Sequence, residues 1–309
     1  MKEETGNVVS PPAAGLPLSD VELRLLQVLV YKECGMHFDE RRTHFLADRL
    51  QRRMRVCQTP SFSSYYRLLT GREGKRELSA LVENLAINET SFFRNKSQLD
   101  LFHKDVLEEL LERKQRAHDF NVRIWSAGCS TGQEPYTIAM LVCDALSYHG
   151  LRNSLPQDVP SAKPPVPAPW KVEVLASDIS YSALRSAQEG LYSETQMEAV
   201  DYAYRLRYFD KVGDKYTIKK LVKGLVHFDF HNLKTEFLPQ HNDVIFCRNV
   251  MIYFDEPEQK RVVDKFYRCL NPEGYLFIGH AESLFGITEK FRMIYRNNGT
   301  AYQRVEGKA

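Results

Sequence analysis

The sequence predicts an α/β protein in which an all-helical N-terminal domain precedes a mostly parallel sheet. Three observations predict it. Apolar residues recur at helical spacing up to about residue 87. From about residue 121, strand-like apolar runs alternate with helical segments, as they do in βαβ units. Two further apolar runs, 291–295 and 300–304, bracket Asn297-Asn298-Gly299, which indicates a C-terminal antiparallel hairpin.

The N-terminal third of the chain carries helix signals only. Residues 1–17 are rich in proline, glycine and alanine, and we expect a disordered tail there. Ser19 and Glu22 have the spacing of a capping box at the start of a first helix. Three more helices are expected at about 39–55, at 61–70 and around 78–85. Residues 18–90 are therefore predicted to form a helical domain.

Residues 91–309 are predicted to form the α/β domain. Strands are expected at 122–126, 171–176, 243–247 and 274–278, and helices at about 134–147, from 180 onward and at 256–270. Two insertions interrupt this pattern. Residues 151–170 contain six prolines, which favours an extended linker. Residues 193–226 include Gly213-Asp214 between apolar runs, which indicates a small β-subdomain built on an antiparallel hairpin.

Composition excludes several classes of protein. With 43% hydrophobic and 27% charged residues, the chain resembles an ordinary soluble globular protein, and its net charge of +2 gives no global attraction for nucleic acid. No apolar run approaches the roughly 20 residues that cross a bilayer. The six cysteines are scattered and the nine histidines lack metal-ligand spacing. We expect a cytoplasmic protein with reduced thiols, without a metal and without direct membrane insertion.

Polar and glycine residues follow the first predicted strand, where open α/β sheets bind ligands. Gly128 and Gly132 lie in this turn, and they would leave space for a cofactor. Glu134 follows, and its carboxylate suits a ligand with a cationic end. A nucleoside that carries an ammonium and a sulfonium therefore fits better than a dinucleotide. The alternative is a plain tight turn between strand and helix.

Three more segments place polar residues where a ligand is expected. Asp178 follows the second strand, where it can accept both hydroxyls of a ribose or instead cap a helix. Residues 88–94 lie at the expected domain junction, where binding sites often occur, and the alternative for this segment alone is a helix end with a core phenylalanine pair. Arg248, Asn249 and Tyr253 interrupt an apolar run after the third strand, which a pure core strand would not favour.

Together these segments resemble the CheR family of chemotaxis receptor methyltransferases. The resemblance rests on N-E-T-S-F-F-R, W-S-A-G-C-S-T-G-Q-E-P-Y, A-S-D-I-S, H-N-L and F-C-R-N-V-M-I-Y-F, in that order, and it covers about residues 18–304. It implies a Rossmann-like class I methyltransferase domain with S-adenosyl-L-methionine as cofactor and S-adenosyl-L-homocysteine as product. It also implies that the substrates are glutamate side chains on the cytoplasmic helical region of chemotaxis receptors.

The resemblance also implies roles for individual residues. It places cofactor contacts at Asn88, Thr90, Arg94, Glu134, Asp178, Asn232, Leu233, Arg248 and Asn249. Arg94 and Tyr253 would lie beside the reacting methyl group, and they are the catalytic candidates. The loop at Gly213 is shorter than in family members that dock a receptor's C-terminal pentapeptide, so we expect methylation without that tether.

A basic stretch of the second predicted helix offers a substrate-docking face. On a helical projection, six arginines fall within a sector about 160° wide: Arg41, Arg42, Arg49, Arg52, Arg53 and Arg55. A surface of this kind suits the acidic helices of a receptor. A solvated helix face and a nucleic-acid patch are the alternatives.

The predicted chemistry requires no general base. A glutamate side chain has an ordinary pKa of about 4.3, so it is already a nucleophile at neutral pH. Two other functions remain open: a methyltransferase for another protein or a small molecule, and a non-catalytic cofactor-binding receptor adaptor. A nucleic-acid substrate is not expected, because Arg248-Asn249-Val250-Met251 stands where an Asn/Asp-Pro-Pro-Tyr motif would be.

Overall fold

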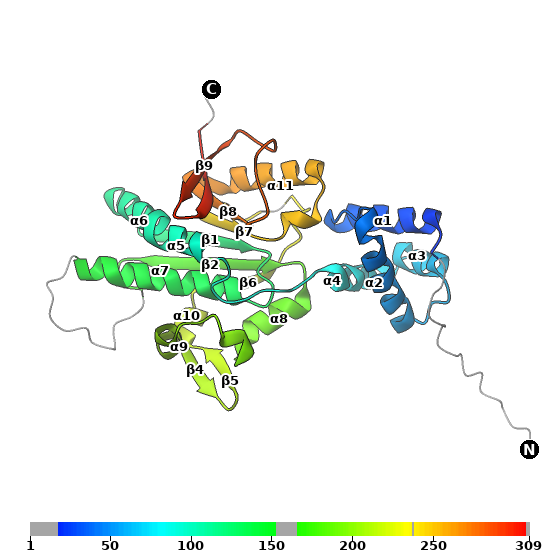
Figure 1. The fold of residues 1–309 in the computed structure, drawn as a ribbon, viewed down its shortest axis with the longest axis horizontal. Coiled ribbons are helices and arrows are strands. Elements are labelled where there is room, and N and C mark those ends of the chain that lie inside the picture. The colour runs from blue at the N-terminus through cyan, green and yellow to red at the C-terminus, as the bar shows by residue number, and fades with distance from the viewer. Residues whose placement is uncertain (1–17, 153–165, 237, 307–309) are drawn as a thin grey trace, which may run out of the picture. The chain divides into compact units, whose positions relative to one another are not determined.

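The computed structural model describes residues 18–152, 166–236 and 238–306. The chain divides into two compact units, residues 1–87 and 88–309, and each is described by itself (Figure 1). The predicted disordered tail and most of the proline-rich segment 151–170 lie outside the described residues. No helix within the described part of the chain is both long and apolar enough to cross a membrane.

The first unit is helical. Its α-helices are α1 (Asp20–Cys34), α2 (Thr43–Val56), α3 (Phe62–Thr70) and α4 (Gly74–Leu85). The capping box predicted at Ser19 and Glu22 is present at the start of α1. The helix predicted at 39–55 is wrong in its first turn, because Asp39 accepts the Arg42 N–H at 3.1 Å and closes a 3-10 helix, η1 (Glu40–Arg42). The projection that placed Arg41 and Arg42 on one α-helical sector therefore does not apply to them.

The second unit contains the predicted mostly parallel sheet. Its strands run in the order β6-β2-β1-β7-β8-β10-β9. The five parallel strands are β1 (Asn121–Ala127), β2 (Lys171–Asp178), β6 (Val226–Phe230), β7 (Asn242–Cys247) and β8 (Leu270–Ile278). β9 (Phe291–Arg296) and β10 (Gly299–Arg304) form the predicted C-terminal hairpin. Its turn is Asn297-Asn298, and both residues have a positive φ, as a two-residue turn of type I′ requires.

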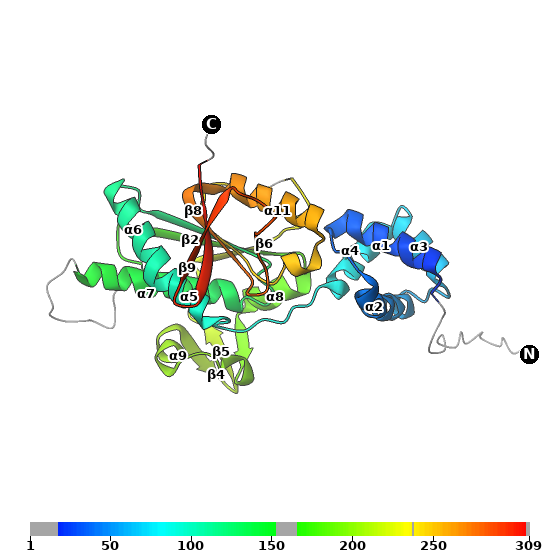
Figure 2. The ribbon, with the colours of Figure 1, turned by 45° about the horizontal axis from the view of Figure 1, so that its top comes forward.

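Helices cover both faces of the sheet (Figures 1 and 2). One face packs against α5 (Lys96–Leu101), a π-helical turn η2 (Phe102–Val106), α6 (Leu107–Arg116) and α7 (Gln133–Arg152). Phe102 of η2 contacts the rings of Phe246 and Phe277 from two strands. The other face packs against α11 (Glu256–Cys269), whose Phe266 meets the ring of Trp125. These two apolar layers fix the strands, and through them the loops at the strand ends.

The segment between β2 and β6 begins with α8 (Tyr181–Glu189) and then forms a small second sheet. This sheet has the order β3-β5-β4, with β3 (Leu191–Ser193), β4 (Phe209–Val212) and β5 (Lys215–Ile218). Three short helices complete it: η3 (Thr195–Met197), α9 (Tyr202–Tyr208) and α10 (Lys220–Lys223). The hairpin predicted at Gly213-Asp214 is confirmed, since Val212 pairs with Lys215 and Gly213 has φ +62°.

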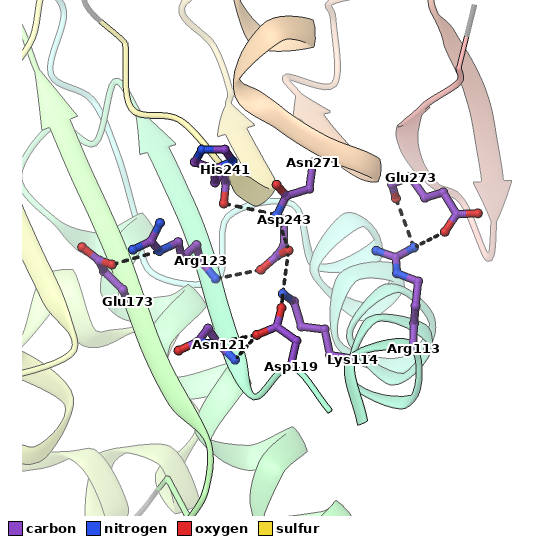
Figure 3. A network of polar contacts seen from close by, with 10 residues as sticks. All are labelled: Arg113, Lys114, Asp119, Asn121, Arg123, Glu173, His241, Asp243, Asn271 and Glu273. Carbon is purple, nitrogen blue, oxygen red and sulfur yellow. Dashed lines mark hydrogen bonds and ion pairs between the residues drawn. The ribbon is translucent and has the colours of Figure 1, made fainter. Parts of the chain in front are cut away.

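The amino ends of the parallel strands carry a network of charged and amide side chains (Figure 3). The Lys114 ammonium lies 2.7 Å from Asp119 and 3.0 Å from the buried carboxylate of Asp243. Asp243 also accepts the Arg123 N–H and the Asn271 amide. Burial raises the pKa of Asp119, but hydrogen bonds from Lys114 and from Asn121 of β1 lower it by more and hold that pKa at about 2.

Candidate active site

The opposite edge of the sheet, at the carboxyl ends of the strands, gathers the segments that the sequence marked. The turn after β1 is fastened to the end of β2, because the N–H groups of Gly128 and Cys129 both donate to the Ser177 carbonyl, at 2.8 and 2.9 Å. Trp125 donates from its indole to the Ser177 hydroxyl at 2.8 Å. The first turn and the end of β2 are thus held together as one surface.

Asp178 lies at the centre of this surface and is nearly buried. One carboxylate oxygen accepts the Ser130 N–H at 2.8 Å, and the other accepts the Ser180 N–H at 2.9 Å. The N-cap of α8 is Ser180, whose hydroxyl accepts the Ala183 N–H. The structure therefore contradicts the capping role considered for Asp178. Its carboxylate instead joins the first turn to the loop after β2.

The segment 88–94 belongs to the second unit and contacts the same surface. The Ser130 hydroxyl donates to the Asn88 carbonyl at 2.9 Å, and the Phe93 N–H donates to the Thr137 hydroxyl at 3.3 Å. Thr90 is half-buried in this segment. Phe92 is fully buried and packs edge-on against two aromatic rings of the small sheet, Tyr192 of β3 and Phe209 of β4. Phe92 is therefore a core residue, as the alternative interpretation of this motif held.

The Glu134 carboxylate and the Arg248 guanidinium lie together beside the first turn, and the charge of Arg94 acts on both. Glu134 accepts the Ser126 hydroxyl at 2.7 Å and lies 3.6 Å from Arg248. Arg248 also donates to the Arg94 carbonyl at 2.6 Å. Burial raises the pKa of Glu134, although the positive charges of Arg248 and Arg94 act in the other direction. Burial likewise lowers the pKa of Arg248, and the Glu134 charge opposes this.

These charges fit the amino-acid end of S-adenosylmethionine, which carries an ammonium and a carboxylate. The Glu134 carboxylate is matched to the ammonium, and the guanidinium groups are matched to the carboxylate. The Nε atom of Arg248 is buried and has no hydrogen-bond partner among the described residues, so one donor remains for a bound acceptor.

The two glycines of the first turn let neighbouring protein atoms pack closely against the backbone. Gly128 and Gly132 have φ values of +91° and +94°, which other residues rarely adopt. A Cβ on Gly128 would lie 2.4 Å from the Val250 side chain, and one on Gly132 would lie 2.8 Å from Ala187. The missing side chains thus make room for neighbouring protein atoms, a requirement that the sequence did not reveal.

Asn232 and Leu233 follow β6 in a loop that a buried lysine holds. The Lys265 ammonium, on α11, donates to the carbonyls of Leu233, Lys234 and Thr235 at 3.3, 3.0 and 2.7 Å. Only 1% of the Lys265 side chain is exposed. Burial lowers the pKa of Lys265, while the Glu236 carboxylate works against this. Sequence reasoning missed Lys265, because on its own helix it has no feature that sets it apart.

A second residue that the sequence did not reveal is Glu282, in the loop after β8. Its carboxylate accepts backbone N–H groups from Gly279, Asn249 and Ile252, at 2.5, 3.1 and 3.0 Å. Burial raises the pKa of Glu282, and these backbone donors act against it. Glu282 therefore fixes the segment that runs from Asn249, with φ +59°, through the short 3-10 helix η4 (Met251–Tyr253). The signal available was an acidic residue just beyond a strand's carboxyl end.

The six candidate docking arginines of the first unit have different surroundings. The Arg53 guanidinium donates two hydrogen bonds to the Glu77 carboxylate, at 3.0 and 2.6 Å. Glu77 also accepts a hydrogen bond from the Tyr65 hydroxyl. The Arg49 guanidinium lies over the Phe45 ring, and its Nε is buried. Arg52 forms an exposed pair with Asp48. Arg41 and Arg55 are exposed as well.

No group of three or more histidine, cysteine, aspartate or glutamate side chains within the described ranges is arranged to hold a metal ion. The polar groups at the carboxyl edge are carboxylate acceptors and guanidinium, amide and backbone N–H donors. They match the polar groups of a nucleoside with an amino-acid tail.

Comparison with known proteins agrees with this geometry. Residues 21–86 match the family "CheR methyltransferase, all-alpha domain", and residues 88–154 and 161–300 match "CheR methyltransferase, SAM binding domain". The chain is 33% identical over 268 residues to a chemotaxis protein methyltransferase of Borreliella burgdorferi, covering 86% of this chain and 89% of the relative. It is 31% identical to the protein of that name from Salmonella typhimurium, over 95% of this chain and 93% of the relative. It is also 31% identical to the one from Escherichia coli, over 90% of each chain. The chain therefore belongs to the CheR methyltransferase family and uses S-adenosyl-L-methionine as its cofactor.

Proposed function

We propose that this protein transfers the methyl group of S-adenosylmethionine to glutamate carboxylates of methyl-accepting chemotaxis receptors, in the cytoplasm, and so forms glutamate methyl esters. The relatives described above carry the name chemotaxis protein methyltransferase. The observation that carries the proposal is the contact of Glu134 with Arg248, which begins the segment that bears Tyr253, together with the nearby charge of Arg94.

The cofactor supplies an electrophilic methyl group, and the protein's task is to hold and align the reactants. The substrate carboxylate is ionised at neutral pH, so no residue needs to remove a proton. Opposite charges are neutralised as the methyl moves, which a dry site favours. We assign cofactor contacts to Asn88, Thr90, Arg94, Glu134, Asp178, Asn232, Leu233, Arg248 and Asn249. The neutral phenol of Tyr253 orients the substrate, because a cation paired tightly with the carboxylate would weaken the nucleophile.

The proposal is tested with tritiated S-adenosylmethionine and a purified receptor cytoplasmic fragment. We expect counts on the fragment that are released by mild base, as carboxyl esters are. Base-stable counts would mean another acceptor atom, and a cofactor-binding protein that transfers no counts would be an adaptor. Fragments with and without their five C-terminal residues are expected to be methylated equally.

Substituting Tyr253 by phenylalanine removes one hydroxyl and keeps the ring. We expect kcat to fall about ten-fold or more, because the carboxylate loses its orienting hydrogen bond. The Kd for S-adenosylhomocysteine, measured by calorimetry, is expected to change less than about two-fold. A large loss of cofactor affinity with kcat unchanged would place Tyr253 at the cofactor instead.

We also propose that the exposed arginines of the first unit attract the acidic receptor helices. We leave Arg53 out of this surface, because Glu77 occupies its guanidinium and its loss would destabilise the unit. The double variant Arg41→Glu/Arg55→Glu is expected to raise the KM for the receptor fragment about ten-fold, with the Kd for S-adenosylhomocysteine unchanged. The control Arg67→Glu/Arg76→Glu makes the same charge change at exposed positions of α3 and α4. Equal effects of the two double variants would mean that only the net charge of the unit matters, and that Arg41 and Arg55 form no specific docking surface.

A further inference from the structure

Phe285 is the most exposed large apolar side chain of the second unit within the described residues, with 95% of its surface accessible. An isolated exposed phenylalanine forgoes the burial of a large apolar surface. Several exposed apolar residues lie elsewhere on the unit, but Phe285 combines near-complete exposure with a fixed backbone and a place beside the candidate active site. These three properties together mark it for function.

A tight turn holds Phe285 in place. The Ile287 N–H donates to the Leu284 carbonyl at 3.0 Å, which closes a turn with Phe285 and Gly286 at its centre. Gly286 has φ +75°, as the second central residue of a type II turn does, and no atom lies within 4 Å of a Cβ built there. Leu284 is buried, and Ile287 packs against the core, so the turn is anchored at both ends.

The loop that carries this turn is joined to the segment that carries Tyr253. The two strands before them are neighbours in register, with Cys247 of β7 opposite Ile278 of β8. Glu282, three residues before Phe285, accepts the N–H groups of Asn249 and Ile252. The Ile252 side chain is itself 37% exposed. Two apolar side chains thus stand on the loop pair that bounds the proposed substrate position.

The two edges of the sheet differ in character. The amino ends of the strands bear the network of ammonium, guanidinium, carboxylate and amide groups shown in Figure 3. The carboxyl edge instead presents Phe285 and Ile252 to solvent, on the two loops that Glu282 joins. An apolar side chain on a fixed turn at the rim of a polar site has the properties of an interface anchor, which buries its ring in a partner at little entropic cost.

We infer that Phe285, supported by Ile252, is an apolar anchor for the substrate polypeptide and places the accepting carboxylate beside Tyr253. This inference rests on the proposed function, and it adds a specificity requirement to it. The preferred glutamates would have an apolar side chain on the same helical face, three or four residues away, to cover the Phe285 ring. The partner is thus a helix with mixed acidic and apolar character, and a purely acidic helix would bind less well.

The test compares Phe285→Ser with Met293→Ser, which removes a 60% exposed apolar side chain from β9. For Phe285→Ser we expect an approximately ten-fold higher KM for the receptor fragment, with the melting temperature and the Kd for S-adenosylhomocysteine unchanged. Met293→Ser is expected to behave as the wild type. An unchanged KM for Phe285→Ser, while the wild type methylates the fragment, overturns this inference and leaves the proposed function intact. A wild type that never methylates the fragment overturns both.

A second pair of variants tests the fixed turn without removing the ring. Gly286→Ala strains a backbone at φ +75°, and Gly213→Ala strains one at φ +62° in the hairpin of the small sheet, where the added Cβ also meets no atom. Only Gly286→Ala is expected to raise the KM for the receptor fragment, and by about five-fold. Sedimentation tests whether a second copy of this chain covers Phe285. We expect the wild type and Phe285→Ser to sediment identically in the absence of substrate. Self-association of the wild type that is lost in Phe285→Ser would identify a second copy as the partner and overturn the inference.

Discussion

Replacing Lys114 by methionine is expected to lower the free energy of unfolding by about 3 to 5 kcal/mol. The Lys114 ammonium lies between Asp119 and Asp243, and the Asp243 side chain is only 4% exposed. Methionine fills much of the same volume but leaves the Asp243 carboxylate buried without its cation. That uncompensated charge, rather than a lost contact energy, accounts for most of the expected effect.

Urea denaturation measures this loss. The control is Lys104→Met, which removes an exposed pair with Asp100 and is expected to cost less than about 1 kcal/mol. The double variant Lys114→Met/Asp243→Asn is expected to recover part of the loss, because an amide oxygen can still accept from Arg123 or Asn271. Cofactor affinity of the folded Lys114→Met protein is expected to be unchanged, since the network lies at the amino ends of the strands (Figure 3). A loss no larger than that of Lys104→Met would contradict this account of the network.

Replacing Glu282 by glutamine is expected to reduce kcat/KM about 100-fold. Both carboxylate oxygens accept backbone N–H groups, one from Ile252 and the other from Gly279 and Asn249. Glutamine presents an NH2 group to one of these sets, so a donor faces a donor and the segment that carries Tyr253 must move. A displacement of about 1 Å is enough to produce a loss of this size.

The control for this variant is Glu289→Gln, which makes the same change at an exposed position of the same loop. Steady-state kinetics with both substrates, together with the melting temperature, separates the two effects. We expect Glu282→Gln to remain folded at the assay temperature and to lose kcat as well as cofactor affinity. Wild-type kinetics for Glu282→Gln would remove Glu282 from the positioning of the site.

Local sequence patterns predicted most of the fold. Alternation of apolar strands and helices predicted β1, β2, β7 and β8, and the turn residues at 213–214 and 297–299 predicted both hairpins. These patterns lie within the same few residues that form each strand, helix or turn, so they can be recognised without knowing which distant residues are in contact. The 3-10 turn at Glu40–Arg42 was not predicted, because a single hydrogen bond from the Arg42 N–H to the Asp39 side chain decides between an α-helix and a 3-10 helix there.

The site was predictable only in part, because several of its residues act through contacts with distant parts of the chain. Asp178 and Glu134 were found from their place after a strand and a turn, and the structure brings both to the carboxyl edge. Lys265 and Glu282 act on backbone atoms about 30 residues away in the chain, which no local pattern encodes. The occupation of Arg53 by Glu77, across 24 residues, is likewise a tertiary contact that a helical projection does not contain.

Calorimetric titration of S-adenosylhomocysteine tests most directly the placement of the nucleoside at the carboxyl edge of β1 and β2. Wild-type protein is expected to bind with a measurable heat, Asp178→Ala about 100-fold more weakly, and the exposed neighbour variant Asp229→Ala like the wild type. No heat for the wild type, or the same Kd for the wild type and Asp178→Ala, would contradict that placement.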